Sequence, residues 1–205
     1  ADIIEIGVPF SDPVADGPVV EEASRRALSD GVNLRGILMD LIQRKGLIQA
    51  GVVLMGYLNP FLQYGYEKLA HDAARGGVHG FIVPDLPHEE AEPLRSALKK
   101  EGIALIPLVG PNTSAERMAL YAAEGEGYVY VVSVMGITGE RGNVAPKVAE
   151  TMRRARSVFK LPLALGFGLR EPAQLEDLPA DARPDAVVFG SALLKHLDEG
   201  KSAEE

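Results

Sequence analysis

Two carboxylic acids near the start of the chain have the arrangement of an acid–base pair. Glu5 lies within a short apolar run, and Asp16 follows it in a loop rich in proline. A glutamate inside a strand and an aspartate on the next loop are solvated differently, so their pKa values separate. One of them could then transfer a proton while the other stays ionised, which suggests general acid–base chemistry.

Strand geometry decides where Glu5 points. Side chains alternate between the two faces of a strand, which puts Ile4, Ile6 and Val8 on one face and Ile3, Glu5 and Gly7 on the other. If the first face meets helices, Glu5 points into the protein interior, where burial raises its pKa.

The spacing of these acids is equally compatible with purely structural roles. Glu5 could be a structural glutamate that faces solvent or is hydrogen-bonded. Asp12 and Asp16 could be ordinary turn formers, a common role for aspartate beside proline and glycine.

Glycines near the end of the chain suggest a site for a phosphate group. The triplet GFG at residues 166–168 and the sequence FGSA at 189–192 each follow an apolar run. Glycine lets backbone N–H groups approach an anion, and a helix that begins at Ser191 would add its dipole. The alternative is that these glycines merely end strands.

Other candidates stand at the ends of apolar runs. The glycine-rich stretch 136–142 predicts a mobile lid. Tyr130 precedes it on a strand and could line the interior or simply pack in the core. Tyr57, Asn59 and Asp85 also stand at strand ends and could line the same site. Asp85 lies between prolines and could equally be a turn residue.

The elements that must position these residues alternate regularly. Apolar runs typical of buried parallel strands cover residues 2–8, 52–57, 80–85, 104–110, 127–133, 161–168 and 185–191. Helical patterns cover residues 18–28, 33–46, 66–75, 89–100, 146–158 and 191–197, with Asn33 as an N-cap and a capping box at Thr113 and Glu116.

This alternation predicts a parallel α/β fold. An open doubly wound sheet lacks its dinucleotide motif, because no G-x-G-x-x-G follows the first strand, so we favour a (β/α)8 TIM barrel. Seven runs are one short of eight, and we expect residues 1–205 to be a single barrel domain that lacks its first strand and helix, leaving free edges on its first and last strands.

The composition of the chain limits the binding partners, metals and cellular location that we expect. The chain of 205 residues is 46% hydrophobic, carries a net charge of −8 and contains no cysteine. We therefore expect no disulfide and no nucleic-acid partner. The histidines show no metal-ligand spacing and no apolar run is long enough to span a bilayer, so we expect no metal, no membrane and a cytoplasmic location.

Taken together, these motifs resemble the α subunit of tryptophan synthase. The most specific is EIGVPFSDPVADGP at residues 5–18. Further matches, in the same order and over nearly the whole chain, are MGYLNP at 55–60, VPDLP at 83–87, YVVSVMGITG at 130–139, GFG at 166–168 and GSA at 190–192.

The resemblance implies a (β/α)8 lyase that cleaves indole-3-glycerol phosphate to indole and glyceraldehyde 3-phosphate by retro-aldol chemistry. It implies that Glu5 is the catalytic acid–base, that Asp16 accepts a hydrogen bond from the indole N–H and that Tyr130 lies near the reacting centre. It implies a substrate-binding set of Phe167 on the indole ring, Thr138 beside Asp16, and Gly139, Gly168, Gly190 and Ser191 on the phosphate.

The resemblance also implies an α2β2 complex with a β subunit that holds pyridoxal phosphate, no cofactor in this chain, and Asp12 and Pro13 at the interface.

Two other hypotheses for the function remain. One is a different phosphate-binding barrel enzyme, which would often need a strand-end lysine that the seven runs lack. The other is a truncated scaffold that keeps the partner surface without turnover.

Overall fold

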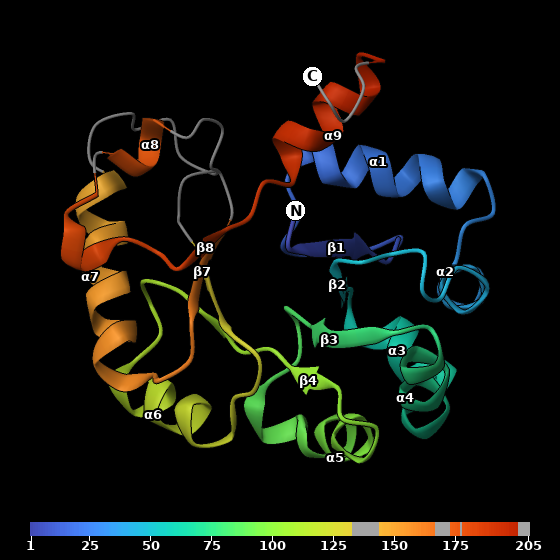
Figure 1. Cartoon of the computed structure of the whole chain (residues 1–205), viewed down its shortest axis with the longest axis horizontal. Helices are drawn as coiled ribbons and strands as arrows, with labels where there is room; N and C mark the ends of the chain where they lie inside the picture. Colours follow the sequence, from blue (N-terminus) through green and yellow to red (C-terminus); the bar gives the residue numbers. More distant parts are fainter. Residues whose placement is uncertain (133–143, 167–172, 177, 201–205) are drawn as a thin grey trace. The chain divides into compact units, whose positions relative to one another are not determined.

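The computed structural model describes residues 1–132, 144–166, 173–176 and 178–200. The chain divides into two compact units, Ala1–Ile106 and Pro107–Glu205 (Figure 1). Each unit contains one four-stranded parallel sheet, and each is described by itself below.

The first unit has the strand order β1-β2-β3-β4. Its strands are β1 (Ile3–Gly7), β2 (Gly51–Met55), β3 (Val78–Ile82) and β4 (Ala104–Leu105). The register sets Glu5 beside Val53, and Val53 beside Gly80. Paired residues of neighbouring strands point to the same face, so these three positions share one face of the sheet.

Helices cover the opposite face of this sheet. The core on that face includes buried side chains of α2 (Leu34–Gln43), α3 (Leu58–Tyr64), α4 (Tyr66–Arg75) and α5 (Glu92–Lys100). The unit also contains α1 (Pro18–Ser29) and the 3₁₀ turn His88–Glu90, neither of which has a buried residue. Ile6 and Val8 join the core with Leu38 of α2, and Phe61 meets Phe81 edge to face at 5.3 Å. The face of Ile6 and Val8 therefore meets the helices, which is the condition under which Glu5 points into the interior.

Local signals explain where these helices begin and end. The Asn33 side chain accepts a hydrogen bond from the Gly36 N–H at 3.1 Å, which confirms the predicted N-cap. Pro18 occupies the first position of α1, where its missing N–H costs nothing. Gly65, with φ of 86°, separates α3 from α4 by a left-handed turn that favours glycine.

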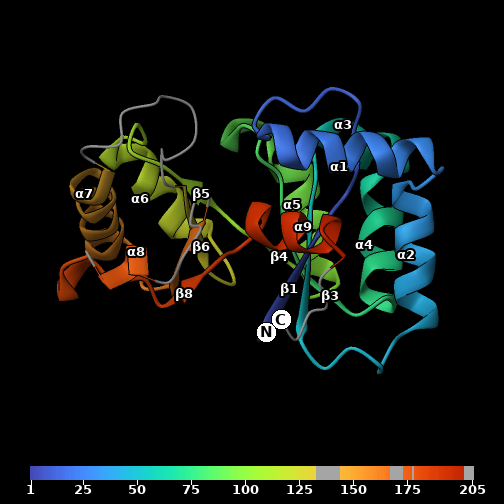
Figure 2. The same cartoon turned by 90° about the horizontal axis from the view of Figure 1, so that it is seen from above.

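The second unit has the strand order β5-β6-β7-β8. Its strands are β5 (Leu108–Val109), β6 (Val129–Val132), β7 (Leu163–Gly166) and β8 (Ala186–Val187). Its helices are α6 (Ala115–Glu124), α7 (Val144–Val158), α8 (Ala173–Glu176), the 3₁₀ turn Ala180–Ala182 and α9 (Ser191–Asp198). Figures 1 and 2 show α6 and α7 side by side against one face of this sheet.

Side chains from α7 tie the second unit together. Met152 is fully buried among Val129, Val131 and Leu163. On the outer side, the Arg154 guanidinium donates to the backbone oxygen atoms of Pro111 and Thr113. These bonds fix the segment between β5 and α6 to α7.

Several sequence-based boundaries need correction. The run 104–110 is two short strands, β4 and β5, which pair with different sheets; Pro107 between them has no N–H to donate to a ladder. Helix α3 was not predicted. The N-cap of α6 is Ser114 and not Thr113, because the Thr113 hydroxyl instead accepts from the Gly110 N–H at 2.9 Å.

Four strands lie at sheet edges among the described residues: β1 and β4 in the first unit, and β5 and β8 in the second. Of these, β1 and β8 were expected to have free edges, whereas β4 and β5 were not. Within the described residues, β1 pairs only with β2 and β8 pairs only with β7. Ile4 on β1 is 41% exposed and Val187 on β8 is 36% exposed. Unpaired strands of this kind present backbone groups that can accept another strand.

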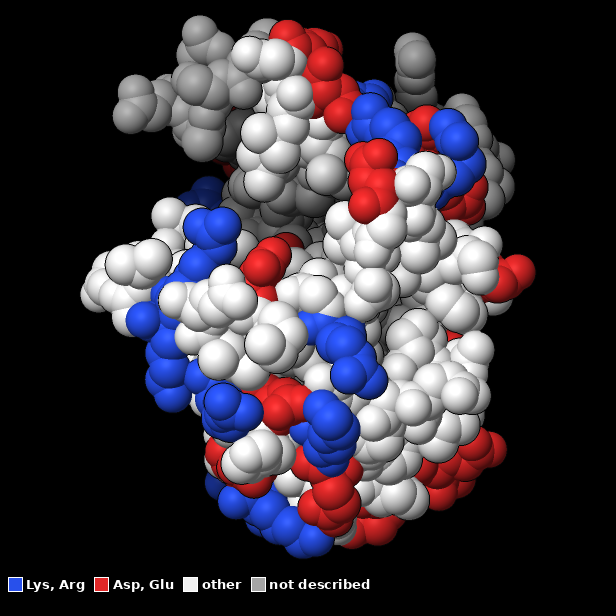
Figure 3. Space-filling model, turned by 90° about the vertical axis from the view of Figure 1, so that its right-hand side faces the viewer, with Lys and Arg blue, Asp and Glu red and all other residues white. Residues whose placement is uncertain are grey.

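Surface charges are mixed in sign. On the face in Figure 3, Lys and Arg side chains lie among Asp and Glu side chains. Exposed pairs include Lys100 with Glu67 at 2.8 Å and Arg153 with Asp181 at 2.6 Å. None of the helices in the described part of the chain has the length and apolar character needed to cross a membrane.

Candidate active site

Glu5 is a largely buried acid in apolar surroundings. On its face of the sheet, Val53, Ile82 and Ile106 are all at most 3% exposed. Its Oε2 atom is buried and has no hydrogen-bond partner among the described residues. Burial raises the pKa of Glu5 from 4.5 to about 7, so near neutral pH the carboxyl group can both donate and accept a proton.

Gly80 helps to make this apolar layer. A Cβ atom at Gly80 would lie 2.8 Å from the Cδ1 atom of Ile106. The missing side chain therefore gives Ile106 room to pack over the strand, at the level where Glu5 and Val53 lie in register. Buried apolar side chains therefore surround the Glu5 carboxyl group, and this burial is the cause of its desolvation.

Asp16 is half-buried on the loop between β1 and α1. Burial is the main cause that raises its pKa, and the nearby Glu21 carboxylate adds to the rise. A hydrogen bond with the Tyr57 hydroxyl acts in the opposite direction. The first unit thus contains two acids in different surroundings, as the sequence predicts.

The loop that bears Asp16 is held at two points. Near its start, the Phe10 N–H donates to the Ser24 hydroxyl at 3.0 Å, and that hydroxyl donates to the Phe10 carbonyl oxygen at 3.2 Å. Near its end, the Ala15 N–H donates to the Tyr57 hydroxyl at 3.0 Å. Between them, Asp12 is exposed and Val14 is 80% exposed.

Asp85 fixes the turn between β2 and α3. Its carboxylate accepts a hydrogen bond from the Leu58 N–H at 2.8 Å, directly after Tyr57. Of the three further candidates at strand ends, Tyr57 holds the backbone of Ala15 and Asp85 holds the backbone of Leu58. The third, Asn59, is exposed on the first turn of α3. Nothing in the sequence indicated the contacts that Ser24 and Tyr57 make with the loop.

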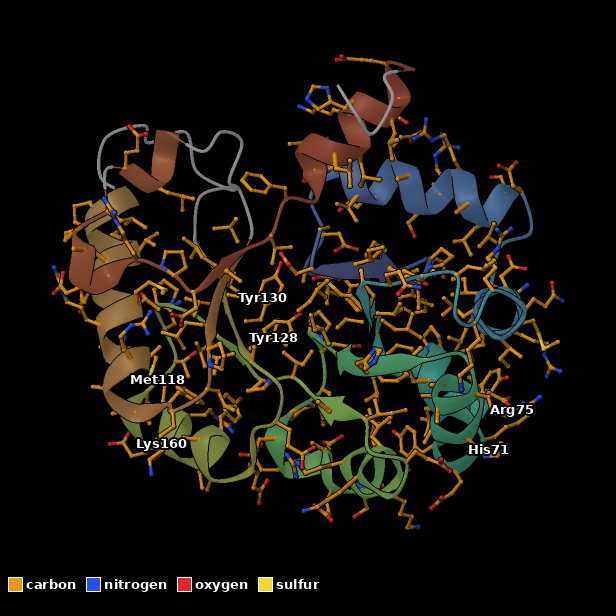
Figure 4. All side chains as sticks on the ribbon, in the orientation of Figure 1. His71, Arg75, Met118, Tyr128, Tyr130 and Lys160 are labelled. Carbon is orange, nitrogen blue, oxygen red and sulfur yellow. The ribbon has the colours of Figure 1, made fainter. Side chains whose placement is uncertain are left out.

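Tyr130 is buried on the second unit's sheet. Figure 4 shows Tyr128 and Tyr130 on the side of the sheet away from Met118 of α6. Tyr130 is 3% exposed. A Cβ atom at Gly166 would lie 2.2 Å from the Tyr130 hydroxyl oxygen and 2.4 Å from its Cζ atom, so the Tyr130 ring lies directly over Gly166.

This contact predicts that Gly166→Ala destabilises the second unit. A methyl group must displace the buried ring or the strand, and overpacking of this kind costs about 1–3 kcal/mol. Gly110→Ala is the matched control, because a Cβ atom there meets only the Val132 Cβ atom at 4.0 Å. Urea unfolding curves measure both; equal stability of the two variants would contradict the contact.

The chain turns into α9 at Gly190. The Leu194 N–H donates to the Gly190 carbonyl oxygen at 3.0 Å, and Gly190 and Ser191 are exposed. The first N–H groups of a helix have no partner within the helix, and they attract anions. The other residues predicted to bind substrate, Thr138, Gly139, Phe167 and Gly168, lie outside the described residues, as does the predicted lid 136–142.

A pocket in the second unit does not coincide with the predicted site residues. An open pocket of about 300 Å³ lies beside β8 and is lined by Leu175, Glu176, Arg183, Pro184, Asp185, Ala186 and Val187, none of them a predicted site residue. Within the described ranges, no group of three or more His, Asp or Glu residues is placed to hold a metal ion.

Comparison with known proteins identifies relatives along the entire chain. The family model described as tryptophan synthase alpha chain matches residues 1–205. The tryptophan synthase alpha chain of Desulfovibrio desulfuricans is 88% identical over 205 residues, which are 100% of this chain and 80% of that protein. The protein of the same name from a Geobacter species is 44% identical over 204 residues, covering 100% of this chain and 76% of the relative.

Solved structures agree. Tryptophan synthase subunit alpha from Legionella pneumophila has a TM-score of 0.84 at 37% identity, covering 98% of this chain and 76% of that one. A chain from the tryptophan synthase α2β2 complex of Pyrococcus furiosus has a TM-score of 0.87 at 34% identity, covering 96% and 79%. The fold is the (β/α)8 TIM barrel of these proteins, and the chain belongs to the tryptophan synthase alpha chain family.

Proposed function

We propose that this chain is a carbon–carbon lyase that cleaves indole-3-glycerol phosphate to indole and glyceraldehyde 3-phosphate in tryptophan biosynthesis. Family membership supports this reaction. The observation that carries the proposal is Glu5, a largely buried carboxyl group whose Oε2 atom has no hydrogen-bond partner among the described residues and whose pKa is about 7. Such a group is suited to proton transfer at neutral pH.

The reaction needs two proton transfers that cancel. Carbon 3 of the indole ring gains a proton, which turns the ring into a cationic leaving group. The hydroxyl group on the adjacent glycerol carbon loses a proton as the carbon–carbon bond breaks, and the bond electrons return to the ring. An aldehyde and neutral indole result. Glu5 removes the hydroxyl proton and helps to deliver a proton to carbon 3, because its pKa of about 7 suits both directions.

Asp16 stabilises the positive charge on the ring. Its carboxylate accepts the indole N–H, which becomes a stronger donor once carbon 3 is protonated. The hydrogen bond from Tyr57 favours the ionised form that this role requires. Tyr130 lies near the reacting centre, Phe167 packs on the indole ring, and Thr138 helps to orient Asp16.

The phosphate group binds to backbone amides. Gly139, Gly168, Gly190 and Ser191 provide N–H groups, and the Ser191 hydroxyl adds one donor. In a (β/α)8 barrel the loops after the last strands and a short helix often form such a site. A site of this kind needs no lysine cluster, in keeping with the net charge of −8.

Gly190→Asp tests the phosphate site. Open space surrounds a Cβ atom at Gly190, and aspartate is a favourable N-cap, so thermal stability should change little. A carboxylate at this helix end repels a phosphate dianion, and the affinity for glycerol 3-phosphate, measured by calorimetry, should fall at least tenfold, roughly 1.4 kcal/mol. Gly190→Asn, similar in size but neutral, is the control. Equal affinity in wild type and Gly190→Asp would place the phosphate elsewhere.

The reaction itself is tested with the unmodified chain and purified indole-3-glycerol phosphate. We expect indole and glyceraldehyde 3-phosphate in equal amounts, at a rate proportional to the chain's concentration. Binding of the substrate without either product would favour a non-catalytic scaffold. Conversion to a product other than indole would favour a different phosphate-binding barrel enzyme.

The remaining assignments follow from the family. The chain acts as one barrel domain in an α2β2 complex with a β subunit, in line with the relative from Pyrococcus furiosus. Asp12, which is exposed, and Pro13 lie at that interface. This chain needs no cofactor of its own, the β subunit holds pyridoxal phosphate, and the complex is cytoplasmic.

A further inference from the structure

Tyr57 connects the end of β2 with the loop that carries Asp16. Its side chain is 4% exposed, and its ring packs against the Phe10 ring with centroids 5.5 Å apart and planes tilted by 31°. The hydroxyl group meets three consecutive residues of the loop: the backbone of Val14, the Ala15 N–H at 3.0 Å and the Asp16 carboxylate.

Counting donors fixes the direction of these bonds. A tyrosine hydroxyl has one proton to donate and can accept from other groups. The Ala15 N–H donates to the Tyr57 oxygen, which leaves the hydroxyl proton for the Asp16 carboxylate. Asp16 is therefore the acceptor in this pair, and the bond favours its charged form.

The backbone next to Tyr57 is held by a residue at the end of another strand, β3. The Asp85 carboxylate, after β3, holds the N–H of Leu58, the residue that follows Tyr57. The backbone at Tyr57 is thus fixed independently of the loop it contacts. The other loop anchor, Ser24, binds Phe10, several residues before Asp16.

We propose that Tyr57 is a positioning residue for the lyase reaction, and that its hydroxyl group clamps Ala15 and Asp16 so that the Asp16 carboxylate is presented as a hydrogen-bond acceptor. The inference rests on the proposed function, because it needs Asp16 to accept the indole N–H. Tyr57 acts through Asp16.

Ligand binding in the Glu5→Gln background tests this role without interference from the Glu5 titration. The affinities of indole propanol phosphate and glycerol 3-phosphate are measured from pH 5 to 9, and their ratio is taken. The ratio cancels the titration of the phosphate group, which both ligands share. It reports on recognition of the indole ring.

Tyr57→Phe keeps the ring and removes the hydroxyl. We expect the affinity ratio at pH 7 to fall about tenfold, as for the loss of one hydrogen bond to a charged group. We also expect the pH at which the ratio declines to move upward, because the bond that lowers the pKa of Asp16 is gone. Glu21, the other titratable group that influences Asp16, is unchanged.

Tyr64→Phe is the matched control. The Tyr64 hydroxyl also donates to an aspartate, Asp72, at 2.7 Å, in a half-buried position at the end of α3. Removing it deletes the same kind of bond in the same unit and should leave the ratio and its pH dependence unaltered. A Tyr57→Phe variant that weakens both ligands equally, as loss of loop structure would, overturns the proposal.

Asp16→Asn tests the role of Asp16 in binding the indole ring separately from the positioning role of Tyr57. If it leaves the ratio and its pH dependence unchanged, the assigned role of Asp16 is wrong and the positioning role falls with it. If Asp16→Asn abolishes the pH dependence while Tyr57→Phe changes nothing, only the positioning role is overturned. If Tyr57→Phe does not fold, 3-fluorotyrosine is placed at position 57, because its hydroxyl is a stronger donor. The pH at which the affinity ratio declines is then expected to fall, and an unchanged pH contradicts the proposal.

Discussion

Replacing Glu5 with glutamine is expected to slow indole release from indole-3-glycerol phosphate by about 10²- to 10⁴-fold, the usual contribution of a positioned acid–base group. The amide has almost the size of the carboxyl group, so it fits the same apolar layer beside Val53 and Ile106. It can neither take the proton of the glycerol hydroxyl nor deliver one to the ring. A continuous assay of indole release measures the change.

Binding should survive this replacement. The Glu5→Gln variant is expected to bind indole propanol phosphate within a few-fold of the wild-type affinity, because the ring and phosphate contacts are elsewhere. Glu67→Gln is the control, since Glu67 is an exposed surface carboxylate that pairs with Lys100 at 2.8 Å. Retained turnover in Glu5→Gln would rule out the acid–base role, and a loss in Glu67→Gln would show that the assay detects general damage.

Alternation of side chains was enough to place Glu5 on the opposite strand face from Ile6 and Val8, but not to decide whether that face meets solvent. The apolar run placed Ile6 and Val8 on the other face from Glu5, and the structure buries those two against helices. Such a pattern is local: a strand that is buried on both faces has a fixed side-chain period, whatever its partners. Alternation therefore separated Glu5 from Ile6 and Val8, and the structure decided that its face is an apolar layer and not solvent.

Contacts between distant segments could not be predicted in this way. The Tyr57 hydroxyl reaches Ala15, 42 positions away in sequence. Likewise, Gly166 reads as a strand end, and only the structure shows the Tyr130 ring over it. These contacts depend on how strands lie beside one another, which periodicity alone does not encode.

Competing local signals caused the wrong boundaries. Thr113 and Ser114 are adjacent, and either hydroxyl could cap α6. The Thr113 hydroxyl bonds to Gly110 and Ser114 takes the cap, because a turn precedes the helix. Pro107 has no N–H to donate to a strand ladder, so the sequence itself contains the signal for a break between β4 and β5 within the run 104–110.

Glu5 should also make the stability of the protein depend on pH. Its pKa is 4.5 in the unfolded chain and about 7 in the folded protein. Below pH 4.5 both states hold the proton. Between pH 4.5 and 7 the unfolded chain releases it while the folded protein keeps it, so the free energy of unfolding falls as pH rises. The total loss is about 3 kcal/mol, and it is complete above pH 7.

Comparing wild type with Glu5→Gln isolates this effect. Glutamine does not titrate, and the shift of Asp16 is common to both proteins and cancels in the difference. Urea unfolding at intervals from pH 4 to 8 should show the variant gaining about 3 kcal/mol on the wild type as pH rises, with the change centred between pH 4.5 and 7. A difference that is independent of pH would mean that the folded protein solvates Glu5 as water does. The same burial that gives the carboxyl group a useful pKa then costs stability at neutral pH, so loss of activity and gain of stability in one variant have one physical cause.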